Sequence, residues 1–199
     1  MPKETGIIMT GDHPVKILNG EKTMTRRTRG LNEINKHPDL WEWFGYDNSG
    51  RYSFRSPRLN WYEIMNIRCP YGGIGDRLWV KETFKVHQRS PDVVWYRADF
   101  QPFGKLSQEQ AKSQWWRPAR FMPRWASRIT LEITSIRVER LQMITEEDAI
   151  AEGCPTFSRL ISPVIWFSEL WDSINAKRGY SWEKNPWVWV IEFKLIERG

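Results

Sequence analysis

Alternation of apolar and polar residues predicts a set of β-strands along the chain. The clearest example is residues 77–84, where Leu78 and Val80 fall on one face and Trp79 and Lys81 on the other. Alternation also predicts strands over residues 128–140 and 187–195, and short apolar stretches predict strands over residues 6–9 and 93–97. The last strand should bury one aromatic and apolar side, made of Trp187, Trp189, Ile191, Phe193 and Leu195.

Three segments between the strands have the features of helices. Residues 12–20 begin with an aspartate cap and an early proline and end at a glycine. Residues 145–153 begin with a threonine and an acidic first turn and also end at a glycine. Residues 162–179 open with Ser-Pro and carry an apolar stripe at helical spacing. Strands and helices in this order are typical of an α+β fold.

Two segments show neither the alternation of a strand nor the spacing of a helix, and they are expected to be insertions. Residues 30–70 mix Asn, Gly, Ser and Pro with many aromatic residues, which a disordered linker would not carry. We expect an ordered insertion with a short helix at 39–44 and a hairpin around 47–50. Residues 100–123 are polar and then basic and aromatic, and are expected to form a loop with a helical piece. The 199 residues should therefore form a single domain with insertions near 30–70 and 100–123.

Composition points to an anionic partner and away from several other classes of protein. Thirty basic against twenty-four acidic residues give a net charge of +6, which favours nucleic acid or a nucleotide. Two cysteines are too few for a disulfide scaffold, and the absence of C-x-x-C argues against a structural zinc site. No apolar leader or long apolar run is present, so we expect a soluble, cytoplasmic protein without a membrane partner.

A basic segment near the N-terminus holds the first candidates for chemistry. Lys22 and Thr25 stand three apart, directly before a run of arginines over residues 26–29. A lysine close to a hydroxyl can activate it, and arginines can hold phosphate. A solvated basic turn is the alternative interpretation. Positions three apart face opposite sides of a regular strand, so Lys22 and Thr25 converge only if the chain turns after Gly20.

Five motifs in this chain resemble those of ASCH-domain proteins of the PUA-like superfamily, in particular the phage and prophage type. They are K-T-x-T-R at 22–26, G-D-R-L-W-V-K-E at 75–82, W-R-P-A-R at 116–120 with the following 122–132, I-T-E-E-D-A-I-A-E-G at 144–153, and W-V-I-E-F-K at 189–194. The resemblance implies a small, partly open β-barrel with flanking helices and a cleft at one side, to which this chain adds its aromatic-rich insertions.

Three of these motifs are similar to those of small bacterial ASCH enzymes that hydrolyse N4-acetylcytidine. The resemblance implies that Lys22 is the proton acceptor, Thr25 the nucleophile and Glu152 the proton donor. Those enzymes are much shorter and lack both insertions. In this chain the insertions could cover the cleft, narrow it or adapt it to another substrate. The alternatives are that Glu152 is a solvent-facing residue in the last turn of its helix and that Thr25 is an ordinary strand hydroxyl.

A second set of candidates combines arginine with tryptophan. Guanidinium groups bind phosphate and bases stack on indole rings, so this combination suits single-stranded nucleic acid. The candidate ligand-binding residues of this set are Arg26, Arg27, Arg29, Trp116, Arg117 and Arg120. The alternative is that the tryptophans lie in the core and the arginine stems cover them, which is the prediction for Trp79 and Trp125.

Glu82 is a further candidate for ligand binding because it closes an apolar strand. A charged residue at such a position often faces a cleft. It could orient Lys22 there or bind the amino group of a base. An ion pair with a nearby arginine or lysine is the alternative.

Together these features predict a protein that binds RNA, DNA or a modified nucleoside in a basic cleft. The mechanistic hypothesis is amide hydrolysis on an N4-acylated cytidine-type base, without a metal or other cofactor. Two alternatives stay open, namely a non-catalytic nucleic-acid-binding module and a ribonuclease.

Overall fold

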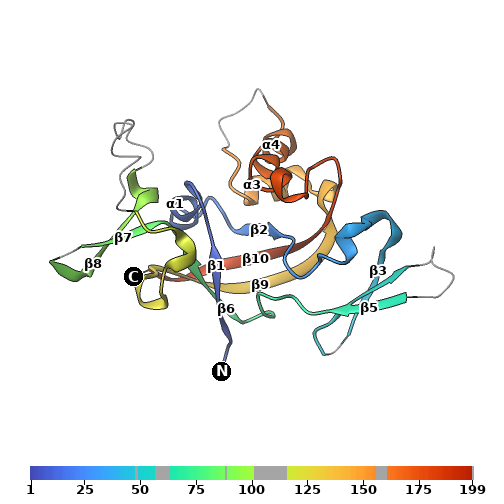
Figure 1. Cartoon of the computed structure of the whole chain (residues 1–199), viewed down its shortest axis with the longest axis horizontal. Coiled ribbons are helices and arrows are strands. Elements are labelled where there is room, and N and C mark those ends of the chain that lie inside the picture. The colour runs from blue at the N-terminus through green and yellow to red at the C-terminus, as the bar shows by residue number, and fades with distance from the viewer. Residues whose placement is uncertain (48, 57–62, 88, 101–115, 156–160, 199) are drawn as a thin grey trace.

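The computed structural model of the chain describes residues 1–47, 49–56, 63–87, 89–100, 116–155 and 161–198. The strands are β1 (Glu4–Ile8), β2 (Met24–Arg27), β3 (Glu42–Tyr46), β4 (Tyr52–Ser56), β5 (Glu63–Ile67), β6 (Arg77–Lys81), β7 (Phe84–His87), β8 (Ser90–Tyr96), β9 (Ile129–Arg140) and β10 (Trp187–Arg198). The α-helices are α1 (His13–Leu18), α3 (Glu146–Ala151) and α4 (Pro163–Asn175). Figure 1 shows these helices above a central sheet.

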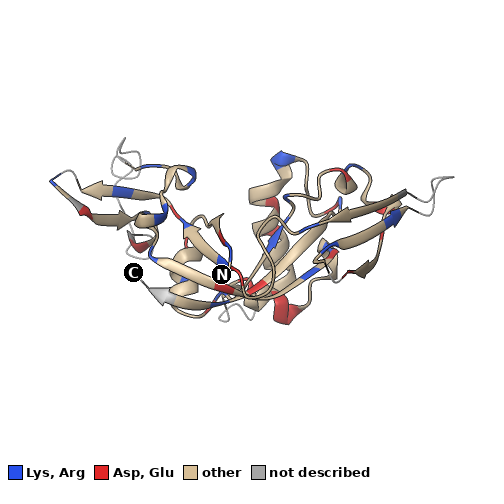
Figure 2. Ribbon diagram, turned by 90° about the horizontal axis from the view of Figure 1, so that it is seen from below, with Lys and Arg blue, Asp and Glu red and all other residues tan. Residues whose placement is uncertain are grey.

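The central sheet is open. Its strand order is β1-β6-β9-β10-β2, with β1 parallel to β6 and the other neighbours antiparallel. β1 and β2 are its two edges, and no pairing between them occurs among the described residues. The sheets β3-β4-β5 and β7-β8 lie at opposite ends of the molecule (Figures 1 and 2). The α+β class, with an open sheet and flanking helices, is confirmed.

β10 supplies residues to the cores on both faces of the central sheet. Successive side chains of a strand point to opposite faces. Trp189 and Phe193 therefore pack into one core with residues of β6 and β9, while Val188 and Val190 pack into another with α4. A strand buried on both sides explains the continuous apolar run of the sequence here, and the predicted burial of Trp189 and Phe193 is confirmed.

The helix predicted over residues 39–44 is wrong. A single 3-10 turn covers Pro38–Leu40, and the chain continues as β3, which pairs with β4. Aromatic residues favour strands where a partner strand is available, and β4 supplies it. The hairpin predicted around residues 47–50 joins β3 to β4 and is confirmed. Most of the insertion predicted at 100–123 lies outside the described residues.

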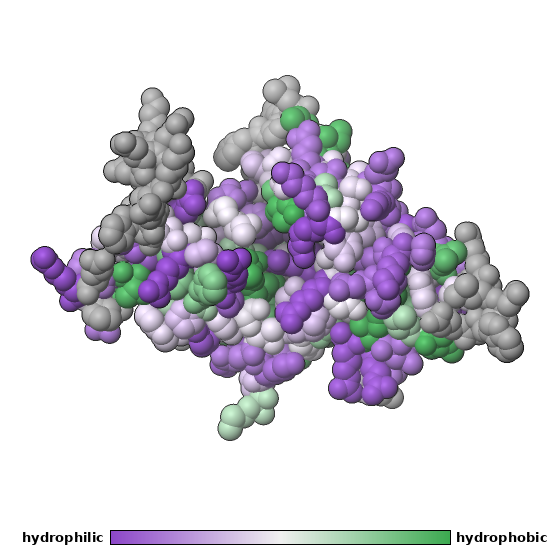
Figure 3. Space-filling view, viewed as in Figure 1, coloured by the Kyte–Doolittle hydropathy of each residue, from purple (hydrophilic) through white to green (hydrophobic). Residues whose placement is uncertain are grey.

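The surface has no single dominant apolar region in the view of Figure 3. Hydrophobic residues visible on this face stand in small separate groups among hydrophilic ones. No helix in the described part of the chain has the length and the apolar character needed to span a bilayer.

Candidate functional site

A cavity of about 580 Å³ lies where the central sheet is open. Both edge strands contribute to it, with Gly6 and Ile8 from β1 and Thr25 and Arg27 from β2. Further parts of the wall come from α1, from the end of α3, from one side of α4 and from single residues of β6 and of the connecting segments. The site is thus built from segments that lie far apart in the sequence.

Glu152 lines this cavity and forms a buried ion pair with Lys22, which lies behind it and does not line the cavity. The Lys22 side chain is 1% exposed, and its Nζ donates to the Glu152 carboxylate at 2.6 Å and to the Glu152 main-chain carbonyl at 2.7 Å. Thr23 donates its backbone N–H to Ala151 at 2.9 Å, which docks the segment before β2 against the end of α3. Gly153 follows with a φ of 96°, and a Cβ at this position would lie 3.1 Å from the side chain of Lys16. A glycine at 153 therefore lets the helix end close against the lysines.

Burial lowers the pKa of two groups here, Lys22 of the pair and His13 near it. Burial lowers the pKa of Lys22, and the charge of Glu152 opposes this effect. His13, on the cavity wall, has its pKa lowered to about 3, first by burial and then by the charge of Lys22. His13 is therefore neutral at neutral pH.

Thr25 lies in β2, opposite Ile191 of β10, and lines the cavity together with Glu152. It is only 4% exposed. Because Lys22 precedes β2 and lies in the segment after Gly20, strand alternation does not set its direction. Thr25 and Glu152 thus line one cavity, and Lys22 bonds to Glu152 across 130 residues of sequence without lining the cavity itself.

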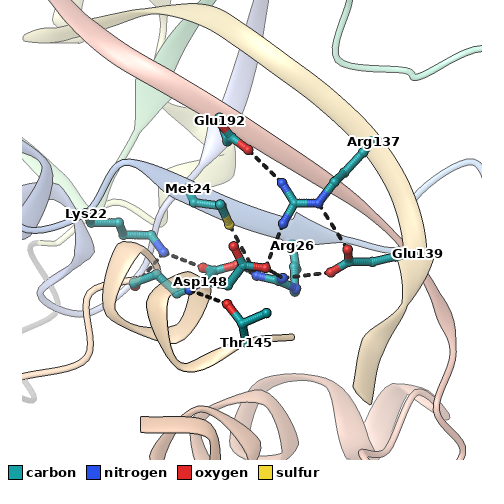
Figure 4. Close-up of polar contacts among 9 residues, drawn as sticks. Lys22, Met24, Arg26, Arg137, Glu139, Thr145, Asp148 and Glu192 are labelled. Atoms are coloured by element: carbon teal, nitrogen blue, oxygen red, sulfur yellow. Dashed lines mark hydrogen bonds and ion pairs between the residues drawn. The ribbon is translucent and has the colours of Figure 1, made fainter. Parts of the chain in front are cut away.

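Arg26 is held by carboxylates (Figure 4). Its Nη2 lies 2.7 Å from Glu139 and 2.5 Å from Asp148, and its Nη1 lies 3.4 Å from Glu152. Arg137 bonds to Glu139, Asp148 and Glu192 and extends the same network. Arg26 also lines the cavity, but its side chain is fully buried and its described ion pairs are all with these carboxylates.

The other predicted ligand-binding residues separate into two groups. Arg27, Arg29 and Arg120 line the cavity. Trp116 and Arg117 do not line it, and the backbone of Arg117 instead bridges to Phe84.

Glu82 lies at a second, smaller pocket of about 200 Å³. Its carboxylate accepts from Arg128 at 2.9 and 3.0 Å, and Arg128 also binds Asp99. Burial raises the pKa of Glu82, and the bond from Arg128 opposes the rise. The ion-pair interpretation of Glu82 is therefore the one that the geometry supports, and the described contacts do not join it to Lys22.

One side of α4 is part of the cavity wall, which the sequence did not reveal. Phe167, Trp171 and Asn175 of this helix and Arg178 after it line the space. A stripe at helical spacing looks the same whether it faces a core or a cavity, so no signal in the sequence distinguished them. The predicted burial of Trp125 is wrong, because it is 62% exposed and its neighbour Ala126 takes the buried position.

The structure is similar to two solved structures. One is an ASCH domain from Lactobacillus crispatus JV V101, at 12% identity and a TM-score of 0.44, covering 98% of this chain and 81% of that one. The other is a protein from Enterococcus faecalis V583 of family DUF984, at 10% identity and a TM-score of 0.42, covering 100% and 78%. No protein-family model and no curated protein matches the chain. Both TM-scores lie below 0.5, so the residues of the cavity have to carry any functional assignment.

Proposed function

We propose that the chain binds a modified nucleoside, free or within nucleic acid, and hydrolyses the acyl amide of an N4-acylated cytidine-type base. One observation carries this proposal: Glu152, which is paired with the buried Lys22, lines a cavity whose wall also holds the hydroxyl-bearing Thr25. A base, a nucleophile and an acid are the groups that amide hydrolysis requires. The resemblance of residues 22–26, 144–153 and 189–194 to ASCH enzymes that act on N4-acetylcytidine supports the same assignment.

In the acylation step, the Thr25 hydroxyl oxygen attacks the acyl carbon and the neutral amine of Lys22 takes the hydroxyl proton. The C–N bond then breaks, and the carboxylic acid of Glu152 gives its proton to the leaving exocyclic amine. The products of this step are the free amine of the base, an acyl ester on Thr25, a Lys22 ammonium and a Glu152 carboxylate.

Water completes the reaction by attacking the ester. The Glu152 carboxylate takes a proton from the water, and the Lys22 ammonium returns a proton to the Thr25 oxygen as the ester bond breaks. A carboxylic acid is released and all three side chains return to their starting forms. Overall, one amide and one water give one amine and one acid.

The proposed mechanism starts from the neutral form of the Lys22–Glu152 pair. The ion pair and the neutral pair differ only by the transfer of one proton along the 2.6 Å hydrogen bond from Lys22 to Glu152. Burial disfavours charged forms and lowers the pKa of Lys22. The neutral pair, which supplies both a base and an acid, is therefore within reach at this site.

A binding module without catalysis is the second candidate function. The observation that favours it is the set of cations on the cavity wall, Arg27, Arg29 and Arg120, together with the net charge of +6. A ribonuclease would use the same basic wall but would cut a labelled strand and leave an acyl amide intact.

Thr25 decides between these functions. Turnover of N4-acetylcytidine, measured by chromatography, should be retained in part by Thr25→Ser and nearly lost in Thr25→Val. Binding by Thr25→Val should change by only about 0.5–1.5 kcal/mol, the net value of one hydrogen bond. Thr23→Val is the matched control, because Thr23 is exposed two positions earlier and its side chain does not line the cavity.

Three outcomes would contradict the hydrolase. Undiminished turnover in Thr25→Val would remove Thr25 as nucleophile. An inactive wild type that still binds labelled single-stranded RNA or DNA would establish the binding module. Cleavage of the labelled strands, with the acyl group untouched, would establish the nuclease.

A further inference from the structure

We propose that the cavity holds a phosphate group of its ligand between Arg27 and Arg178, so that the ligand is a nucleotide, free or within a strand, and not a bare nucleoside. The choice of base rests on the proposed function above. The phosphate site rests on its own contacts and can be tested separately.

Arg27 has unused donor capacity at the cavity. It extends from β2, and its Nη2 donates to the Ile8 carbonyl of β1 at 2.8 Å and contacts the sulfur of Met9 at 3.2 Å. Its Nε is buried and has no hydrogen-bond partner among the described residues. A buried guanidinium N–H without an acceptor is costly, and a phosphate oxygen would supply that acceptor.

Arg178 lines the same cavity from a different element. It ends the 3-10 turn Ala176–Arg178 that follows α4, and its Nη1 donates to Asn175 at 3.2 Å. Within the described parts of the chain, no carboxylate forms an ion pair with Arg27 or with Arg178. Two guanidinium groups from separate elements thus border one space without an ion-pair partner of their own among the described residues.

The electrostatics of this space favour an anion. Burial is the main reason that the pKa of Arg27 is lowered; Tyr71 and the charge of Glu152 oppose the effect, and the positive charge of Arg178 adds to it. Glu152 is the one acidic residue among the described residues that line the cavity, and Lys22 and Arg26 already bind it. Arginine binds phosphate through paired N–H···O bonds, which match the planar guanidinium.

The position of the site relative to Thr25 fits a single nucleotide. Thr25 and Arg27 are two residues apart in β2 and share a face, roughly 7 Å apart along the strand. One nucleotide can span this separation between its phosphate and its base. Lys81, Arg29 and Arg120 continue the cationic wall, where the neighbouring phosphates of a strand would lie.

The test compares ligands that differ only in phosphate. Binding of N4-acetylcytidine, its 5′- and 3′-monophosphates and a short RNA carrying this base is measured by calorimetry with Thr25→Val, which prevents turnover. At least one monophosphate should bind tenfold or more tightly than the nucleoside. Arg178→Ala should reduce this difference to threefold or less and leave nucleoside affinity unchanged. Lys177→Ala, which removes an equal charge one position earlier, should preserve the difference.

Equal affinity for the nucleoside, both monophosphates and the short RNA would overturn the proposal, as would a phosphate preference that survives Arg178→Ala. Competition by inorganic phosphate that depends on Arg178 would support the site even if no acylated base is hydrolysed. Turnover of the nucleoside without any phosphate preference would support the hydrolase and refute the phosphate site. If only the short RNA gains affinity through Arg178, the phosphate belongs to a strand and not to a free nucleotide.

Discussion

Replacing Glu152 by glutamine isolates the energetic consequence of the buried pair. Glutamine keeps the size of the side chain and removes its charge, so Lys22 loses its ionic partner at 2.6 Å. Lys22 then keeps only the main-chain carbonyl of residue 152 at 2.7 Å. Arg26 keeps Glu139 and Asp148 as partners. The loss of stability should therefore come from Lys22.

Two considerations set the size of this loss. Leaving a buried charge without its partner typically costs about 3–5 kcal/mol. Lys22 can instead release its proton, so that no charge stays buried. At pH 7 this release costs about 4–5 kcal/mol for a lysine of ordinary pKa, so it does not make the loss much smaller. We therefore expect Glu152→Gln to lower the free energy of unfolding by about 3–5 kcal/mol at pH 7.

The loss should depend on pH with a defined sign. The pKa of Lys22 is lowered in the folded state by burial, so above that pKa the unfolded chain binds one proton more than the folded chain. Stability then rises with pH, by at most about 1.4 kcal/mol per pH unit, up to the ordinary lysine pKa near 10.4. The difference in the free energy of unfolding between wild type and Glu152→Gln should therefore be smaller at pH 9 than at pH 7.

Urea unfolding at pH 7 and pH 9 measures both quantities. The double variant Lys22→Met/Glu152→Gln leaves neither charge of the pair buried alone, so it should be more stable than Glu152→Gln. Glu147→Gln, an exposed change on the same helix, should show no such pH dependence. A loss below about 1 kcal/mol at pH 7, or a large loss that is the same at both pH values, would refute this account of the pair.

Two further predictions concern the core and the basic wall. Trp189→Ala should cost about 3–5 kcal/mol in denaturant melts, because Trp189 is fully buried, packs edge-on against Tyr52 and donates to the Arg29 carbonyl. Trp125→Ala, at an exposed tryptophan, should change stability by no more than about 0.5 kcal/mol, and comparable losses for both would contradict the assignment of the core. Joint replacement of Arg27 and Arg29 by alanine should flatten the slope of log K against log salt by about 0.7 for each phosphate of single-stranded RNA released. Lys36→Ala serves as the control. An unchanged slope in the arginine variant would mean that Arg27 and Arg29 do not contact the phosphates of the ligand.

The strands that carry apolar runs could be predicted from the sequence, and the short mixed segments could not. In β10 the aromatic and apolar side was predicted from alternation, whereas the burial of Val188 and Val190 on the other face became visible only in the structure. Residues 39–44 have several aromatics in a short run, where helical and strand periods cannot be separated. The pairing of β3 with β4 decided the outcome there, and such a contact is not visible in local sequence.

The residues of the candidate site, too, could be predicted from the sequence only in part. No spacing rule connects Lys22 to Glu152, and only the resemblance of two motifs suggested that they meet. The arginines of residues 26–29 look like one basic unit in the sequence. In β2, however, alternation turns Arg26 towards the carboxylates of α3 and β9 and Arg27 towards β1. This strand is four residues long and mostly polar, so no apolar pattern revealed the alternation in advance.

The openness of the sheet explains why Arg178, and not Arg27, is the decisive residue for the phosphate site. A closed barrel of this size would fill its interior with side chains, whereas here the cavity occupies the gap between the edge strands β1 and β2. The Arg27 side chain crosses this gap to bind the Ile8 carbonyl. Its removal would therefore disturb the fold around the cavity as well as the ligand, and weaker binding could have either cause. Arg178 is exposed at the end of its helix, so a loss of phosphate preference in Arg178→Ala, with unchanged urea stability, can be assigned to the ligand alone.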